Sequence, residues 1–126
     1  MSTGFLIVFL GAGLGGAMRH GVNVATLALF GSGFPFGTLG VNIVGSFVMG
    51  VLVEWFALKV DPGAPWRLFL ATGILGGFTT FSAFSLDAAL MLERGSHWAA
   101  AGYVLLSVIA SIGALFAGLM LVRQFA

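Results

Sequence analysis

The stretch Gly73-Ile-Leu-Gly-Gly-Phe-Thr-Thr-Phe-Ser-Ala-Phe-Ser85 decides how this chain folds. It lies within an apolar run, residues 68–91, that is long enough to cross a bilayer as a helix. Three glycines and the adjacent β-branched residues Thr79 and Thr80 weaken helical order there. The sequence therefore predicts a membrane helix that is broken in its middle. A break of this kind is tolerated only where it is buried in protein or lines a watery cavity.

Two interpretations of the broken segment are open from its own residues. Breaking the helix frees backbone N–H and C=O groups, which can coordinate ions. Phe81 and Phe84 share one helical face because they stand three positions apart. Hydroxyl side chains add polar groups at bilayer depth, on Thr79, Thr80, Ser82 and Ser85. These features fit an ion site, and they also fit a helix–helix contact rich in Gly, Ser and Thr.

The composition identifies an integral membrane protein. Of the 126 residues, 60% are hydrophobic and only 7% are charged, whereas soluble domains usually carry about 25% charged residues. Each of four apolar runs exceeds the roughly 20 residues that a membrane helix needs. They predict spans at residues 4–30, 36–58, 68–91 and 98–122. We expect an all-α membrane protein of one domain, residues 1–126, in which the third helix is broken.

Several classes of function find no support. The chain has no cysteine, which excludes disulfides and thiol-based metal sites or nucleophiles. Its five Lys and Arg residues form no basic patch, so nucleic acid is not an expected partner. No carboxylate pair or nucleophile–base arrangement is present, and we expect no enzyme activity. The G-x-G-x-x-G pattern at residues 11–16 lacks the context of a dinucleotide site. We interpret its Gly11 and Gly15 as a G-x-x-x-G pair that forms a helix-packing face.

The charges encode the orientation in the membrane only weakly. Four spans place both termini on one side, together with Lys59, Arg67 and Arg123. Arg94 falls on the other side. The excess favours termini inside the cell, and so small a margin is also what a chain that inserts in both directions would show.

The second and fourth spans carry polar residues at every fourth position, which places them on one helical face. In the second span these include Thr38, Asn42 and Ser46, and in the fourth they are Tyr103, Ser107 and Ser111. Hydroxyl and amide groups can donate hydrogen bonds to a small anion. The same rows would also serve as interhelical hydrogen-bond seams.

Arg19 and the two phenylalanines complete the candidate site. An arginine near bilayer depth by default faces protein or water, and its charge can attract anions into a vestibule. A snorkelling arginine close to the interface is the alternative. The positive edges of the Phe81 and Phe84 rings can replace part of an anion's water without holding it too tightly.

Three motifs carry a family resemblance. They are Gly15, Gly16, Ala17 and Arg19 in the first span; Gly37-Thr38-Leu39, Asn42, Gly45-Ser46-Phe47 and Gly50 in the second; and Gly73, Gly76-Gly77-Phe78-Thr79-Thr80-Phe81-Ser82 and Phe84 in the third. With these motifs the sequence resembles the Fluc (CrcB-type) family of small fluoride channels. His20 and Ala83 stand where an aromatic residue and a threonine are expected, and both changes leave the ion-lining positions intact.

The resemblance implies passive, selective export of fluoride from the cytoplasm, across a bacterial inner membrane, which relieves fluoride toxicity. It implies an antiparallel, dual-topology homodimer with two pores. Phe81 and Phe84 would line each pore, and Asn42 would orient these rings and contact the anion. The other pore residues would be Thr38, Thr80, Ser82, Tyr103, Ser107 and Ser111. Arg19 would lie near a vestibule, and the backbone carbonyls of Gly76 and Thr79 would hold a structural Na⁺ at the dimer interface.

Two other classes remain as alternatives. A small four-helix multidrug or cation antiporter needs a carboxylate deep in the first span, and residues 4–30 contain none. A non-conducting membrane assembly subunit would have its polar rows facing other helices rather than water.

Overall fold

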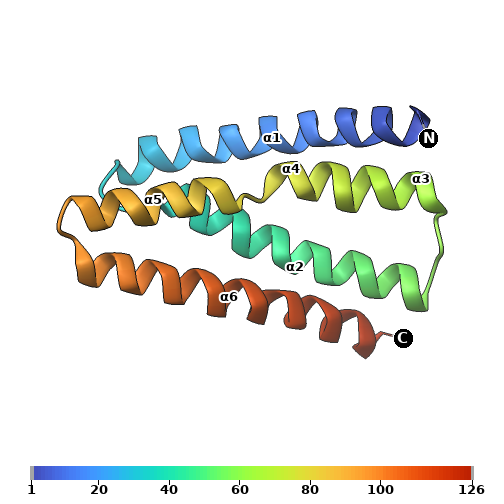
Figure 1. Cartoon of the computed structure of the whole chain (residues 1–126). Coiled ribbons are helices and arrows are strands. Elements are labelled where there is room, and N and C mark those ends of the chain that lie inside the picture. The colour runs from blue at the N-terminus through green and yellow to red at the C-terminus, as the bar shows by residue number, and fades with distance from the viewer. Residues whose placement is uncertain (1, 126) are drawn as a thin grey trace.

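The computed structural model describes residues 2–125, and within them every regular element is helical. Four helices are long and apolar enough to cross a membrane, as predicted, namely Ser2–Phe30, Phe36–Leu58, Ala64–Glu93 and His97–Gln124. The first, second and fourth are α1, α2 and α6, and the third is divided into shorter elements. The helices lie side by side with both termini at the same end (Figure 1).

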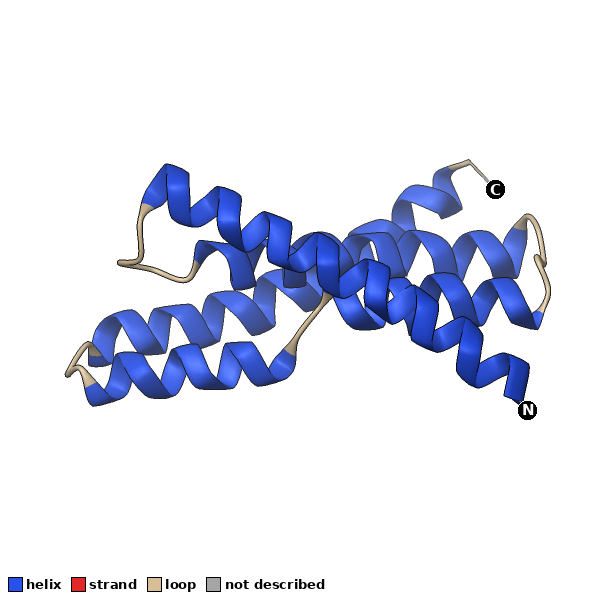
Figure 2. Cartoon of the chain, turned by 90° about the horizontal axis from the view of Figure 1, so that it is seen from above, coloured by secondary structure: helices blue, strands red, loops and turns tan. Residues whose placement is uncertain are grey.

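The third span is interrupted, which confirms the prediction from its sequence. It runs through α3 (Ala64–Arg67), a π-helical segment η1 (Leu68–Leu75), α4 (Gly76–Phe78) and α5 (Phe81–Glu93). Between α4 and α5 the backbone is extended, with φ −86° and ψ 159° at Thr79 and φ −154° and ψ 122° at Thr80. Figure 2 shows this link as a loop between two helical pieces. Helix α5 restarts because the Thr80 hydroxyl accepts a hydrogen bond from Ala83 N at 3.1 Å.

The third span begins earlier than predicted. The predicted span of residues 68–91 leaves Pro65 in the loop before it, but α3 already begins at Ala64. Pro65 stands in the first turn of α3, where its missing N–H would have no intrahelical partner anyway. The proline therefore starts this helix rather than ending the previous one. The π-helical geometry of η1 was not predicted either.

Glycines hold the first half of the third span against α1, backbone to backbone. A Cβ atom added at Gly11 would lie 2.9 Å from the Cα of Gly73, and one at Gly77 would lie 2.9 Å from the Cα of Ala12. A Cβ at Gly15 would meet the carbonyl of Ile74. Contacts this close leave no room for a side chain, so Gly11 and Gly15 form the packing face that the sequence predicts.

Helices α2 and α6 approach each other equally closely. A Cβ atom at Gly50 would lie 3.0 Å from the carbonyl carbon of Leu115. At the end of the bundle that holds the termini, Arg123 forms an ion pair with Glu54. Towards the other end, α5 packs on both helices through a buried cluster that includes Leu39, Phe84, Met91, Ala100 and Tyr103. These contacts place the break in the third span next to the polar rows of α2 and α6.

Candidate functional site

The Asn42 side chain clamps the extended backbone of Thr80. Its Nδ2 donates a hydrogen bond to the Thr80 carbonyl oxygen at 3.0 Å, and the Thr80 N–H donates to its Oδ1 at 2.8 Å. These two bonds satisfy both backbone groups that Thr80 would otherwise leave unpaired in the membrane. A carboxamide has two N–H donors, so Asn42 keeps one for another ligand.

Arg19 satisfies another carbonyl that the break frees. Its Nε donates a hydrogen bond to the Gly77 carbonyl oxygen at 3.1 Å, and the side chain is partly buried. The arginine therefore faces protein rather than lipid, as expected for this depth. It brings a fixed positive charge to the broken segment, on the side of α1.

Two further carbonyl oxygens at the break have no donor. The Thr80 N–H, which would reach the Gly76 carbonyl in a continuous helix, donates to Asn42 instead. The Ala83 N–H, which would reach the Thr79 carbonyl, donates to the Thr80 hydroxyl. Within residues 2–125 the Gly76 and Thr79 carbonyl oxygens accept no hydrogen bond, and Gly76 is exposed. Over the same residues no group of three or more His, Asp or Glu side chains could hold a metal ion.

A cavity of about 350 Å³ lies between α2, α6 and the break. Predicted site residues that line it are Asn42, Thr79, Thr80, Phe81, Phe84, Ser107 and Ser111. The hydroxyl oxygens of Ser107 and Ser111 are buried and have no hydrogen-bond partner among the described residues. Buried polar groups are nearly always paired, so these hydroxyls are available to a ligand in the cavity, to which each can donate a hydrogen bond.

The two phenylalanines meet at the edge of this cavity with different exposures. Their ring centroids are 5.4 Å apart and the ring planes are inclined by 51°. Phe84 is buried at 8% exposure, whereas Phe81 is 78% exposed. The single chain therefore leaves one ring of the pair on its outer surface.

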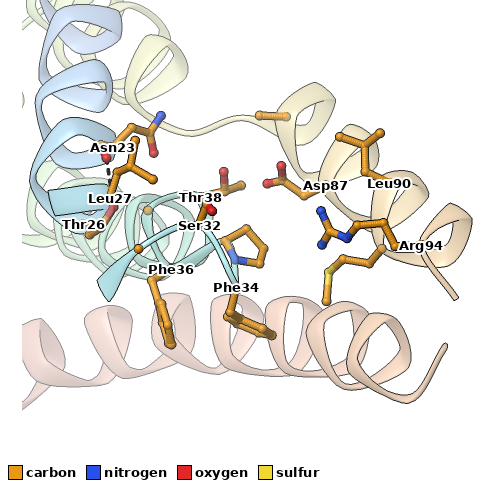
Figure 3. Close-up of a pocket in the computed structure, with 15 residues that line it drawn as sticks. Asn23, Thr26, Leu27, Ser32, Phe34, Phe36, Thr38, Asp87, Leu90 and Arg94 are labelled. Carbon is orange, nitrogen blue, oxygen red and sulfur yellow. Dashed lines mark hydrogen bonds between the residues drawn. The ribbon is translucent and has the colours of Figure 1, made fainter. Parts of the chain in front are cut away.

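A second cavity of about 320 Å³ lies at the opposite end of the bundle from the termini. Figure 3 shows the side chains of Thr38, Asp87 and Arg94 directed towards its interior. The ring of Tyr103 contacts that of Phe84, with centroids 5.3 Å apart, and its hydroxyl donates a hydrogen bond to Asp87 Oδ2 at 3.2 Å. Tyr103 thus contacts Phe84, which lines the first cavity, and bonds to Asp87, which lines the second, although Tyr103 itself is fully buried.

The structure does not gather all predicted residues in one place. Thr38 lines the second cavity. Tyr103 and Ser82 line neither cavity, Tyr103 because it is fully buried and Ser82 because it is exposed on the surface. Sequence reasoning gave no role to Asp87, although it is the carboxylate within the third apolar run. Its position three residues after Phe84, on the same helical face, is the signal that could have identified it.

Comparison with known proteins identifies relatives over almost the whole chain. The model of the family described as CrcB-like protein, Camphor Resistance (CrcB), matches residues 6–119. A Methylobacterium nodulans protein is 60% identical over 120 residues, which are 95% of this chain and 96% of that protein. A Granulibacter bethesdensis protein is 56% identical over 119 residues, 94% of both chains. A Rhodopseudomonas palustris protein is 54% identical over 119 residues, 94% of this chain and 96% of that one. All three are named fluoride-specific ion channel FluC.

Proposed function

The chain belongs to the CrcB-like protein family, and we propose that it is a passive, fluoride-selective channel that exports F⁻ and relieves fluoride toxicity. The observation that carries this proposal is the pair of buried, unpartnered hydroxyls of Ser107 and Ser111 in the cavity beside the helix break. They lie in the same cavity as the rings of Phe81 and Phe84. Such a site offers hydrogen-bond donors to an anion deep in the membrane.

The cavity can replace the water that F⁻ loses on entry. The serine hydroxyls and the remaining N–H of Asn42 donate hydrogen bonds, and they can reorient as the ion passes. The phenyl rings turn positive edges towards an anion. Conduction requires binding strong enough to admit the ion and weak enough to release it, and neutral donors with ring edges provide this balance better than a fixed cation in direct contact.

The charges around the cavity favour an anion over a cation. Within residues 2–125 no carboxylate lines the cavity beside the break, and the nearby break carries the guanidinium of Arg19. Helix α1 contains no acidic residue that could exchange protons for a cationic drug. Ser107 and Ser111 of the α6 polar row also line a cavity rather than a helix contact, which a non-conducting assembly subunit would not require.

We also propose that two copies assemble as an antiparallel, dual-topology homodimer in the bacterial inner membrane. The exposed ring of Phe81, the exposed hydroxyl of Ser82 and the exposed backbone of Gly76 support this arrangement. In a single chain these groups would meet lipid at mid-membrane. The Gly76 carbonyl oxygen accepts no hydrogen bond among residues 2–125, and an unpaired polar group in lipid costs several kcal/mol. A second copy packed on this face would cover them and add its own Phe81 to the neighbouring cavity.

The residues at the break also fit the structural Na⁺ that the family implies. The donor-free carbonyl oxygens of Gly76 and Thr79 are the type of ligand that unwound membrane helices offer to Na⁺. Both carbonyl oxygens lie at the break. Two copies that meet there would therefore each contribute one pair of carbonyl oxygens to the ion. When bound, the ion would supply a positive charge that attracts these carbonyl oxygens. We expect replacement of Na⁺ by N-methyl-D-glucamine to lower the thermal midpoint of the purified protein; an unchanged midpoint in both media would contradict the site.

Efflux from liposomes tests the proposed function. We expect purified protein to release F⁻ without a proton gradient while retaining Cl⁻. Phe81→Ile should reduce F⁻ efflux at least tenfold without dissociating the assembly, because it removes one ring from the cavity. Phe116→Ile is the matched control, since Phe116 is exposed on α6 and lines neither cavity. No F⁻ efflux, equal Cl⁻ efflux, or transport that depends on a proton gradient would refute the channel.

A further inference from the structure

Arg94 lines the second cavity without an ion-pair partner among residues 2–125. It directly follows α5 and lies two helical turns beyond Asp87, so that both side chains point to the same space (Figure 3). The ion pairs within residues 2–125 join Arg67 to Asp61 and Arg123 to Glu54, at the other end of the bundle. Arg94 therefore forms no ion pair within residues 2–125, and its charge is available to a ligand.

The start of α2 adds backbone donors to the same cavity. This 23-residue helix begins after Pro35 without a side-chain cap. The N–H groups of Gly37 and Thr38 have no acceptor among the described residues, and both residues are buried and line the cavity. Free N–H groups and the helix dipole favour an anion at this place. Arg94 lines the same cavity, and its side chain and that of Thr38 come from different helices (Figure 3).

The negative charge of Asp87 would hinder an anion in this cavity unless a positive charge lay nearby. Tyr103 contacts the Phe84 ring of the first cavity and donates a hydrogen bond to Asp87 Oδ2, whose side chain lines the second cavity. An anion that moves from the first cavity to the second along these residues would meet the Asp87 carboxylate. A carboxylate beside the path repels a second anion unless a cation offsets it. Arg94 is the cationic side chain that lines this cavity within the described residues.

We propose that Arg94 is the anion-collecting residue at this mouth of the pathway. It binds a small, hard anion together with the N–H groups of Gly37 and Thr38, and it offsets the charge of Asp87. This inference rests on the proposed function, because the anion it collects is the one that the channel conducts.

Initial F⁻ efflux rates of Arg94 variants in liposomes test the inference at low and high concentrations of an impermeant salt. We expect Arg94→Gln to lower the rate roughly fivefold at low ionic strength and much less at high ionic strength, where charge is screened. Arg94→Lys should keep most of the rate. Asp87→Asn combined with Arg94→Gln should recover part of it, because the unbalanced carboxylate is gone. Arg67→Gln, at the other end of the bundle, is the control and should conduct as the original protein does.

The outcomes distinguish a failure of the Arg94 assignment from a failure of the proposed F⁻ conduction. If the original protein conducts F⁻ and Arg94→Gln conducts equally well, the mouth assignment is wrong while the channel stands. An equal loss in Arg94→Gln and Arg94→Lys, insensitive to salt, would show a structural role and would also overturn it. The salt dependence of the original protein gives a check that needs no variant: its rate should fall as ionic strength rises. If the original protein conducts no F⁻, the proposed function fails first.

Discussion

Truncating Asn42 is the sharpest test of how the broken helix is held. Asn42→Ala removes the hydrogen bonds to the Thr80 carbonyl oxygen, at 3.0 Å, and from the Thr80 N–H, at 2.8 Å. Both Thr80 groups then lose their only partners, since the extended link has no helical donor or acceptor to replace them. Water from the adjacent cavity can reach this backbone and recover part of the loss.

The expected magnitude follows from these two bonds. Each hydrogen bond contributes about 1 kcal/mol net, and each stranded buried group costs about 1–3 kcal/mol. With partial hydration from the cavity we expect a loss of about 2–4 kcal/mol in unfolding free energy. For a chain of this size, that corresponds to a fall in the thermal midpoint of roughly 8–15 °C. F⁻ efflux should fall as well, because the position of Phe81 depends on the turn that Thr80 begins.

The assay is thermal unfolding in detergent followed by efflux from liposomes, with Val44→Ala as the control. Val44 lies on the same helix, but 53% of it is exposed and it lines neither cavity. Asn42→Asp separates the two bonds: it keeps the acceptor for the Thr80 N–H and replaces the donor to the carbonyl by a negative charge. If Asn42→Ala leaves both the midpoint and the efflux at the level of Val44→Ala, the clamp does not hold the break and our reasoning fails.

Three further predictions are independent of the clamp. Ser111→Ala should lower F⁻ efflux about tenfold without destabilising the ion-free protein, because its hydroxyl is unpaired there; a matching loss of thermal stability would contradict this. Gly15→Ala should destabilise the protein by more than about 2 kcal/mol, since its Cβ would overlap the third span, whereas Gly13→Ala, with nothing within 4 Å, should be neutral or stabilising in the same thermal assay. A backbone N–H in its own loop and the Arg67 guanidinium lower the pKa of Asp61 below 3.8. Its contribution to stability is therefore present above that pH and lost as the pH falls through the folded value. Asp61→Asn should remove this acid-range component from unfolding curves measured against pH, and an unchanged pH profile would show that the loop contact contributes nothing.

The sequence alone determined the membrane class, the four spans and the place where the third span breaks. These properties are local. Apolar length identifies a span wherever it packs, and adjacent β-branched residues after glycines weaken a helix whatever its neighbours are. The close-packing face of Gly11 and Gly15 belongs to the same group, because its small-residue spacing lies within one helix. The predicted start of the third span at residue 68 was wrong, because Pro65 lies in the first turn of that span rather than in the loop before it.

Only the tertiary structure decided which groups freed by the break remain available. Arg19 reaches Gly77 across 58 positions of sequence, and Asn42 reaches Thr80 across 38. Such partners depend on the register in which whole helices pack, and spacing within a single helix does not encode that register. The same packing joins Tyr103 to Asp87 and divides the polar rows between two cavities. The sequence thus specified the donors that an anion would need, and the helix packing determined which of them stay unpaired for it.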